Sequence, residues 1–363
     1  MGCASSSVVC EPVVMACGNS GGFGCILPMK DNIESMKLLI DMSSTLIVHY
    51  FDKTINKTIV PKGGIIQFLE ANNMFGKTMD INTLAFKFLK IHPIKSIVEI
   101  FKKEITGIRL AHSAWGDKFY TYSTFPILNG ICALEFLPIE KQKFLLNDGN
   151  NPRGIMYQNI YLFPQTFCGK VSSLVDEYNK LNNFVSIKKL YDEVYMPLQI
   201  LHSKQIVHND IKFDNILLCN GEFRIIDFGF TQKMYEGPLT FSGTKGWLHP
   251  RFTFFGKDFV DTKLTEIYKI KKQSFDFDVA ITQSQDYCKN NIWSVNDTFN
   301  FLKIVILFYS KNHHQQLTPE ITADNKHALT ILKELETFVC LELNNKQSGG
   351  STEIQRLYKK YIH

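Results

Sequence analysis

Residues 206–230 carry the side chains with the clearest chemical potential in this chain of 363 residues. The segment reads IVHNDIKFDNILL at 206–218 and FRIIDFGF at 223–230. An apolar run leads to Asp210, Asn215 follows it, and a second apolar run ends at Asp227. One carboxylate could meet an acceptor hydroxyl, while an amide and a second carboxylate could hold Mg²⁺ against phosphates. The order of these residues therefore predicts phosphoryl transfer.

The same residues, as His-x-Asp, Asn and Asp-Phe-Gly in order, resemble the eukaryotic-type Ser/Thr protein kinase family. The resemblance runs from about residue 60 to the end and weakens in the last stretch. It implies an α+β, two-lobed protein-kinase fold with a small, mostly β N-lobe and a larger helical C-lobe. It also implies ATP and Mg²⁺ as cofactors and a protein as substrate. Asp210 is then catalytic, and Asn215 and Asp227 are the metal ligands.

The family also carries a lysine on a strand, paired with a glutamate on the following helix. TLAFKFL at 83–89 contains Ala85-x-Lys87 on an alternating apolar run. IVEIFKKEITGIRL at 97–110 has helical periodicity and places Glu104 seventeen residues after Lys87. The resemblance thus implies that Ala85, Lys87, Glu104 and Asp227 bind the nucleotide.

Two segments are candidates for the glycine loop that covers the phosphates. GNSGGFG at 18–24 lies more than sixty residues before the lysine and needs a large insertion between two strands. FLEANNMFGKTMDI at 68–81 needs none, because KTMDI would be the next strand and Asn82-Thr83 a tight turn. We favour this second register, with Gly76 as its remaining glycine, although Ala71 and Asn73 stand where the other two belong. The candidate loops are therefore 69–78 and, as the alternative, 18–26.

Two residues of the catalytic segment narrow the class. Lys212 matches the lysine that Ser/Thr kinases of the family carry to the γ-phosphate, which favours Ser/Thr acceptors. Asn209 stands where the family usually has the arginine that receives an activation-loop phosphate. A neutral amide cannot make that charged contact, so we expect activity without such phosphorylation.

Downstream, TFSGTKGWLHPRF at 240–252 resembles the substrate-binding end of the activation segment. Thr244, Trp247 and Pro250 match the family's threonine, aromatic residue and proline. Arg251 departs from it, because the family has a glutamate that anchors this segment. The transfer chemistry does not depend on that anchor.

The chain divides by these assignments into an N-terminal extension at 1–59, an N-lobe at 60–160 and a C-lobe at 161–363. A hinge is expected at 161–169, and an insertion at about 252–290. Asp297 is preferred over the IWSVN segment as the start of the buried central helix, because TFNFLKIVILF then supplies its apolar face. KLLIDMSSTLIVHYFDK at 37–53 fits a strand or a helix.

Three functions of different classes remain open. The first is an active Ser/Thr protein kinase. The second is a catalytically weak pseudokinase that serves as a binding module, which the degenerate loop and Arg251 favour. The third is a small-molecule phosphotransferase, which Lys212 and the activation segment disfavour. The composition, rich in Asn, Lys, Ile and Phe, suggests similarity to kinases of large DNA viruses.

The composition and the N-terminal residues limit which partners and which cellular compartment can be expected. Hydrophobic residues make up 45%, charged residues 21%, and the net charge is +5 without a basic stripe, so a nucleic-acid partner is not expected. Nine cysteines without metal spacing predict free thiols in an intracellular, cytoplasmic protein, in the host cytoplasm if the origin is viral. The start MGCASS fits N-myristoylation at Gly2, with palmitoylation of Cys3 as a second anchor, which predicts membrane association.

Overall fold

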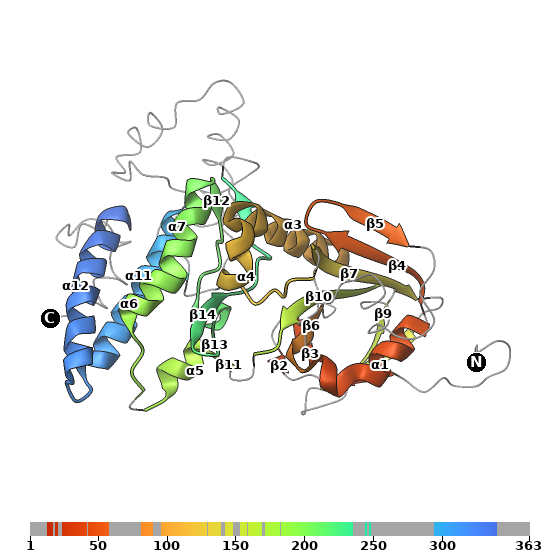
Figure 1. Ribbon diagram of the computed structural model, residues 1–363, viewed down its shortest axis with the longest axis horizontal. Coiled ribbons are helices and arrows are strands. Elements are labelled where there is room, and N and C mark those ends of the chain that lie inside the picture. The colour runs from red at the N-terminus through yellow and green to blue at the C-terminus, as the bar shows by residue number, and fades with distance from the viewer. Residues whose placement is uncertain are drawn as a thin grey trace, which may run out of the picture. The chain divides into compact units, whose positions relative to one another are not determined.

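The structure is a computed structural model whose contacts divide the chain into two compact units (Figure 1). Unit 1 comprises residues 1–109 and 124–169, and unit 2 comprises residues 110–123 and 170–363. The described residues are 13–16, 19–20, 24–41, 43–57, 81–89, 96–128, 130–138, 142–147, 153–157, 159–168, 171–181, 183–234, 244, 247 and 294–339.

Unit 1 is built on a seven-stranded antiparallel sheet of order β2-β3-β6-β10-β7-β4-β5. A three-stranded sheet of order β1-β8-β9 lies in the same unit, with β1 parallel to β8. The strands are β1 (Val13–Ala16), β2 (Asn19–Ser20), β3 (Gly24–Pro28), β4 (Ser43–Tyr50), β5 (Thr54–Lys57), β6 (Leu84–Leu89), β7 (Ile131–Pro138), β8 (Gln142–Asn147), β9 (Arg153–Tyr157) and β10 (Ile160–Thr166).

Strand β6 carries Lys87 and lies inside the large sheet. Its register pairs Ile26 of β3 with Lys87 on one side and Phe163 of β10 with Lys87 on the other. Both edges of β6 are therefore occupied. The prediction that KTMDI at 77–81 is the neighbouring strand is wrong, because a strand has only two edges. Residues 69–80 lie outside the described part of the chain, and Ile81–Thr83 form the 3₁₀-helix η1.

Residues before position 60 belong to unit 1 and contribute to its main sheet, whereas the sequence suggested a separate extension. The segment 37–53 is both helix and strand: α1 (Met29–Asp41) ends before β4 begins. Leu46 and Val48 alternate along β4 and are fully buried, as expected for one face of a strand. The unit boundary lies after Gly169, at the end of the predicted hinge.

Helix α3 (Ile97–Trp115) follows the Lys87 strand, as its periodicity predicted. Phe101, Ile105 and Ile108 are buried and share one face at helical spacing, while Lys102 and Lys103 are exposed. Packing of this apolar face fixes the helix and hence the direction of Glu104. After α3 the chain makes a short turn through η2 (Gly116–Lys118) and α4 (Phe119–Tyr122).

Unit 2 consists mainly of helices, with two small sheets. Strands β11-β13-β14 form one sheet, and β12-β15 form the other. The elements are β11 (Val171–Ser173), α5 (Leu174–Asn179), α6 (Ile187–Leu190), the π-helical turn η3 (Tyr191–Tyr195), α7 (Met196–Ser203), β12 (Ile206–Val207), η4 (Phe213–Asn215), β13 (Ile216–Cys219), β14 (Glu222–Ile225), β15 (Gln232–Lys233), α11 (Val295–His313) and α12 (Pro319–Val339).

Helix α11 is the buried central helix of unit 2. The residues predicted for burial are all at most 1% exposed, namely Phe299, Phe301, Leu302, Val305 and Ile306. Asp297 lies in its first turn, where the sequence placed the start of the apolar helix. The predicted insertion at 252–290 lies outside the described residues.

The cysteines differ in state. Cys25, Cys168 and Cys219 are disulfide-bonded, so the prediction of free thiols is wrong for these three. Cys132 is a free, buried thiol, and burial raises its pKa to about 12. Among the helices in the described ranges, none is both long and apolar enough to cross a membrane.

Candidate active site

The candidate catalytic residue Asp210 follows strand β12 and is 2% exposed. Lys212 Nζ and Asn215 Nδ2 both donate to its Oδ2 atom at 2.8 Å. The backbone N–H and the hydroxyl of Thr244 donate to Oδ1 at 3.2 and 3.1 Å. Four donors from three residues therefore fix the carboxylate in one orientation. Such positioning is what a group that meets an acceptor hydroxyl requires.

Lys212 connects Asp210 with the activation segment. Its Nζ also donates to Thr244 Oγ1 at 2.5 Å, and its side chain is 15% exposed. The ammonium thus lies beside the carboxylate and remains partly open to solvent. The sequence predicted Lys212 and Thr244 as family matches, and the structure brings both to Asp210. Trp247 packs against Phe213 at 5.2 Å between ring centroids; Gly76, Pro250 and Arg251 lie outside the described residues.

Asn215, a predicted metal ligand, is held so that its amide oxygen is spare. Its Nδ2 donates to both the backbone carbonyl and the carboxylate of Asp210 at 2.8 Å. Both partners are acceptors only, which assigns the nitrogen and the oxygen of the amide. No donor from the described residues is recorded on Asn215 Oδ1. The backbone carbonyl of Asn215 accepts from the backbone N–H of Ile226 at 3.0 Å. Because Asp227 follows Ile226 in the chain, this bond ties the segment of Asp227 to Asn215.

Asp227 has a backbone φ of 65°, in the left-handed region, and its side chain is half-buried. Phe228, which follows it, is 1% exposed and contacts Trp115, Phe119 and His208. The buried ring of Phe228 therefore holds the preceding residue, Asp227, in place. A left-handed aspartate costs about 1–2 kcal/mol, which the surrounding packing must offset.

His208 is a structural residue and not a catalyst. It is fully buried, and its Nδ1 accepts from the backbone N–H of Asp210 at 3.3 Å. Its Nε2 therefore carries the proton and donates to the carbonyl of Ile226 at 3.2 Å. The imidazole thus joins the Asp210 loop to Ile226, which follows β14 and precedes Asp227.

Asp297 of α11 holds the loop before Asp210 through its carboxylate. Its Oδ2 accepts from the backbone N–H of His208 at 2.8 Å and from His202 Nε2 at 3.1 Å. Its Oδ1 accepts from the backbone N–H of Asn209 at 2.8 Å. Asp297 is 0% exposed, so these bonds are shielded from water. The sequence predicted its helix, but it gave no sign of this contact, which depends on packing between distant segments.

Asn209, where the family has an arginine, lies at φ 67° and is 5% exposed. Its Nδ2 donates to the carbonyl of Phe230 at 3.3 Å, and its own carbonyl accepts from Asn296 Nδ2. The side chain is therefore engaged with the segment that follows Asp227. Asparagine tolerates positive φ better than most residues, which fits it to this position.

Lys87 and Glu104 form the predicted ion pair in unit 1. Lys87 Nζ donates to Glu104 Oε1 at 2.7 Å, and the two side chains are 15% and 6% exposed. Strand β6 supplies the lysine, helix α3 supplies the glutamate, and Ala85 is fully buried two residues before Lys87. The pairing places an ammonium group at a fixed position, which suits it to contact phosphate oxygens.

Gly24 belongs to GNSGGFG, the candidate loop that the sequence argument did not favour. It begins β3, where an added Cβ atom would lie 3.2 Å from Cε and Cγ of Lys87 and 3.1 Å from the carbonyl oxygen of Phe88. Only glycine allows this approach without a shift. Within GNSGGFG, Asn19 and Ser20 form β2 and Gly24 begins β3, which pairs with the lysine strand β6. The predicted strand beside β6 is thereby corrected, whereas the 69–78 loop with Gly76 lies outside the described residues, and its contact with phosphate stays a prediction.

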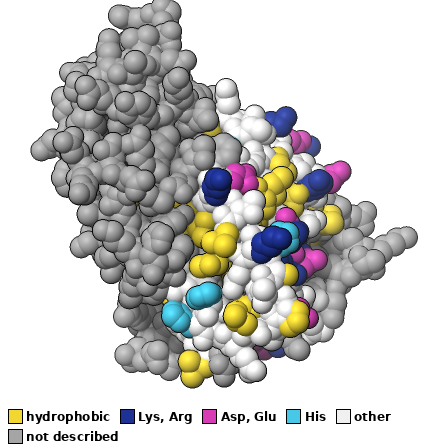
Figure 2. Space-filling model, turned by 90° about the vertical axis from the view of Figure 1, so that its left-hand side faces the viewer, with side chains coloured by type: hydrophobic (Ala, Val, Ile, Leu, Met, Phe, Trp, Pro, Cys, Tyr) yellow, Lys and Arg dark blue, Asp and Glu magenta, His cyan; other side chains and the backbone are white. Residues whose placement is uncertain are grey.

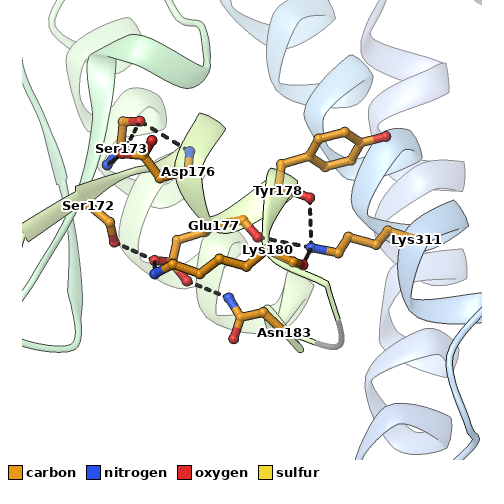
Figure 3. A network of polar contacts seen from close by, with 8 residues as sticks. All are labelled: Ser172, Ser173, Asp176, Glu177, Tyr178, Lys180, Asn183 and Lys311. Carbon is orange, nitrogen blue, oxygen red and sulfur yellow. Dashed lines mark hydrogen bonds and ion pairs between the residues drawn. The ribbon is translucent and has the colours of Figure 1, made fainter.

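A polar network organises the segment that follows the predicted hinge (Figure 3). Glu177 of α5 accepts hydrogen bonds from Ser172, Lys180 and Asn183. Burial alone would raise the pKa of Glu177, but these donors lower it below its ordinary value. Lys311 of α11 donates to the carbonyls of Glu177, Tyr178 and Lys180 at 2.7–2.9 Å, which caps the C-terminal end of α5.

Figure 2 shows one face of the molecule, on which basic and acidic side chains are interspersed with hydrophobic ones. The charged side chains described on this face are thus of both signs. The absence of a nucleic-acid partner stays a prediction.

The comparisons with known proteins agree with this arrangement. Residues 157–268 match the protein kinase domain family. The serine/threonine-protein kinase pakH of Dictyostelium discoideum is 34% identical over 127 residues, which cover 31% of this chain and 24% of that protein. The serine/threonine-protein kinase STE20 of Kluyveromyces lactis is 30% identical over 162 residues, which cover 39% and 16%. The cAMP-dependent protein kinase type 3 of Saccharomyces cerevisiae is 38% identical over 84 residues, which cover 23% and 21%.

Asp210, Asn215 and Asp227 all lie within residues 157–268, the part of the chain that matches the protein kinase domain. The match to the protein kinase domain and the similarity to serine/threonine-protein kinases support a eukaryotic-type Ser/Thr protein kinase. The predicted fold class, a mostly β small lobe and a helical large lobe, is confirmed. The chain spans about a quarter or less of the length of these relatives. Similarity to viral kinases is untested by these matches and stays a prediction.

Proposed function

We propose that this protein transfers the γ-phosphate of ATP to Ser or Thr hydroxyls of protein substrates. The observation that carries the proposal is the buried Asp210 carboxylate, oriented by Lys212, Asn215 and Thr244. Asp210 accepts the proton of the attacking hydroxyl while that oxygen bonds to the γ-phosphorus and ADP leaves. Lys212, beside Asp210 and partly open, is placed to neutralise charge on the transferred group.

The kinase family generally uses ATP and Mg²⁺, and the described residues fit both. The spare amide oxygen of Asn215 and the half-buried carboxylate of Asp227 are hard oxygen donors of the type that Mg²⁺ prefers. Bound there, the ion would neutralise phosphate charge. In unit 1, Lys87 would contact phosphate oxygens while Glu104 holds its ammonium, and Gly24 would keep β3 close to that lysine.

The alternative functions are weaker. A pseudokinase would not need Asp210, Lys212 and Asn215 in one bonded cluster, nor the Lys87–Glu104 pair. A small-molecule phosphotransferase would not need Thr244, a residue of the activation segment, on the catalytic carboxylate. Both observations support a kinase that acts on peptides.

The test is to identify the product. Purified protein is incubated with Mg²⁺ and ATP labelled at the γ-phosphate, together with mixed basic and acidic protein substrates, and phosphorylated residues are located by mass spectrometry. We expect phosphoserine and phosphothreonine, and no transfer when EDTA removes Mg²⁺. Label found only on small molecules, or no label with intact ATP binding, would favour one of the two alternatives.

We also propose lipid anchoring at Gly2 and Cys3, if translation starts at Met1. One myristoyl chain binds membranes only marginally, so the second chain on Cys3 is needed for stable association. Mass spectrometry of protein from eukaryotic cells tests both modifications. Cys3→Ser should release the protein from membranes, whereas unmodified Gly2 in a wholly soluble fraction would refute the anchor.

A further inference from the structure

The chain between β3 and β6 adds a hairpin to the main sheet of unit 1. Strand β4 pairs with β7, and β5 pairs with β4, so the hairpin forms the edge beyond β7. Its turn is closed by a hydrogen bond from Tyr50 N to Lys53 O at 2.7 Å. Figure 1 shows helix α3 running beside this hairpin. Because α3 carries Glu104, the hairpin lies against the element that orients Lys87.

Arg109 of α3 binds the turn of the hairpin through its guanidinium group. Nε and Nη2 donate to the carbonyl of Tyr50 at 3.0 and 2.6 Å. Nη2 also donates to the carbonyl of Lys53 at 3.0 Å and to Thr54 Oγ1 at 3.2 Å. A planar guanidinium can satisfy several acceptors at once, whereas a single amine cannot reproduce this set. Arg109 thus donates hydrogen bonds to three residues at the turn of the hairpin, Tyr50, Lys53 and Thr54.

A second contact lies on the other side of Glu104. The ring of Phe101, which is 4% exposed, stacks on Tyr161 with centroids 4.2 Å apart and meets the edge of His49 at 5.0 Å. His49 belongs to β4, and its Nε2 lies 3.1 Å from Glu135 Oε2. The hairpin therefore supports α3 both through Phe101, before Glu104, and through Arg109, after it.

We infer that the β4–β5 hairpin is a built-in clamp on α3, with Arg109 as the positioning residue that keeps Glu104 against Lys87. The inference rests on the proposed function, because it concerns how that function's ion pair is held. A helix fixed on both sides of Glu104 cannot rotate the carboxylate away from Lys87 without breaking contacts to the hairpin.

The experiment compares Arg109→Gln with Lys103→Gln, which removes the same charge from an exposed position of the same helix. Hydrogen exchange of the α3 amides is measured first. We expect exchange over 97–109 to quicken about tenfold in Arg109→Gln and to stay unchanged in Lys103→Gln, because charged hydrogen bonds are lost only in the former. Thr54→Val, which removes one acceptor on the hairpin side, should give a smaller change and replaces Arg109→Gln if that variant does not fold.

Activity is then measured in a double-mutant cycle with Glu104→Gln. Arg109→Gln should lower kcat/KM for ATP about tenfold in the wild-type background and change it little when Glu104 is already replaced. If Arg109 had a purely structural role, Arg109→Gln would lower kcat/KM by the same factor with and without Glu104→Gln. Such independent effects of the two substitutions would overturn the inference. So would unchanged α3 exchange. If the wild type transfers no phosphate, the proposed function fails, while the exchange data still decide whether the clamp exists.

Discussion

Asp297 offers a direct test of how the catalytic loop is held. Its carboxylate accepts from the backbone N–H groups of His208 and Asn209, both at 2.8 Å, and from His202 Nε2. Asp297→Asn keeps the volume but replaces one acceptor oxygen by an NH₂ group. In either orientation of the amide, that group faces at least one backbone N–H, and a buried donor is left unsatisfied.

The size of the effect follows from these contacts. One unsatisfied buried donor costs about 1–3 kcal/mol, and loss of charge from the remaining bonds costs about 1 kcal/mol more. We therefore expect Asp297→Asn to lower the free energy of unfolding of unit 2 by about 3 kcal/mol. For a urea m-value of about 3 kcal/mol/M, the unfolding midpoint falls by about 1 M.

Tryptophan fluorescence is the appropriate assay, because Trp115 and Trp247, the tryptophans in the described part of the chain, both belong to unit 2. The matched control is Asp192→Asn, which removes the same charge from an exposed pair with Lys188 and should change stability by less than about 0.5 kcal/mol. A midpoint for Asp297→Asn equal to that of Asp192→Asn would refute the reasoning. It would mean that the loop does not depend on this carboxylate.

Three further predictions follow from single contacts. Glu177→Gln should destabilise the protein at about pH 7, and its difference from wild type should shrink as the pH falls below the ordinary pKa of 4.5. The reason is that the folded-state pKa of Glu177 is lowered, so its stabilisation is present above the ordinary pKa and is lost as pH falls through the folded-state value. Equal urea midpoints for the two proteins at about pH 7 would contradict this. Gly24→Ala should lower kcat/KM for ATP about tenfold by displacing Lys87, and a rate within twofold of wild type would argue against the close approach. Phosphatase treatment should leave the transfer rate unchanged, because Asn209 is neutral and bonded to Phe230, and because Thr231 is only 6% exposed; a drop of about tenfold would mean that another residue receives a phosphate.

Sequence reasoning succeeded where the signal is local. The spacing of Asp210, Lys212 and Asn215 fixes which residues share one loop, and the structure brings them together. The periodicity of 97–110 likewise predicted the helix, and the spacing of seventeen residues, with the family resemblance, predicted the pairing of Glu104 with Lys87. In such cases a few residues determine both the element and the direction of its side chains.

The predicted strand beside β6 was wrong because the evidence for strand pairing is not local. Pairing of β3 with β6 joins segments that are more than fifty residues apart, and nothing in the sequence of KTMDI shows that both edges of β6 are occupied. The shorter connection appeared preferable, although long insertions add only a slowly growing entropy of closure. Contacts of Asp297 with the loop backbone are hidden for the same reason, since backbone acceptors leave no pattern in the sequence.

The most direct measurement of the central claim compares phosphoryl transfer by wild type and Asp210→Asn under saturating Mg²⁺ and ATP. Loss of the proton acceptor should lower kcat by about 10²–10⁴, while the dissociation constant for Mg²⁺-ATP, measured by calorimetry, changes little. Tryptophan fluorescence checks that the variant is folded. Equal transfer rates for the two proteins, in preparations free of other kinases, would contradict the assignment of Asp210 and the proposed kinase activity.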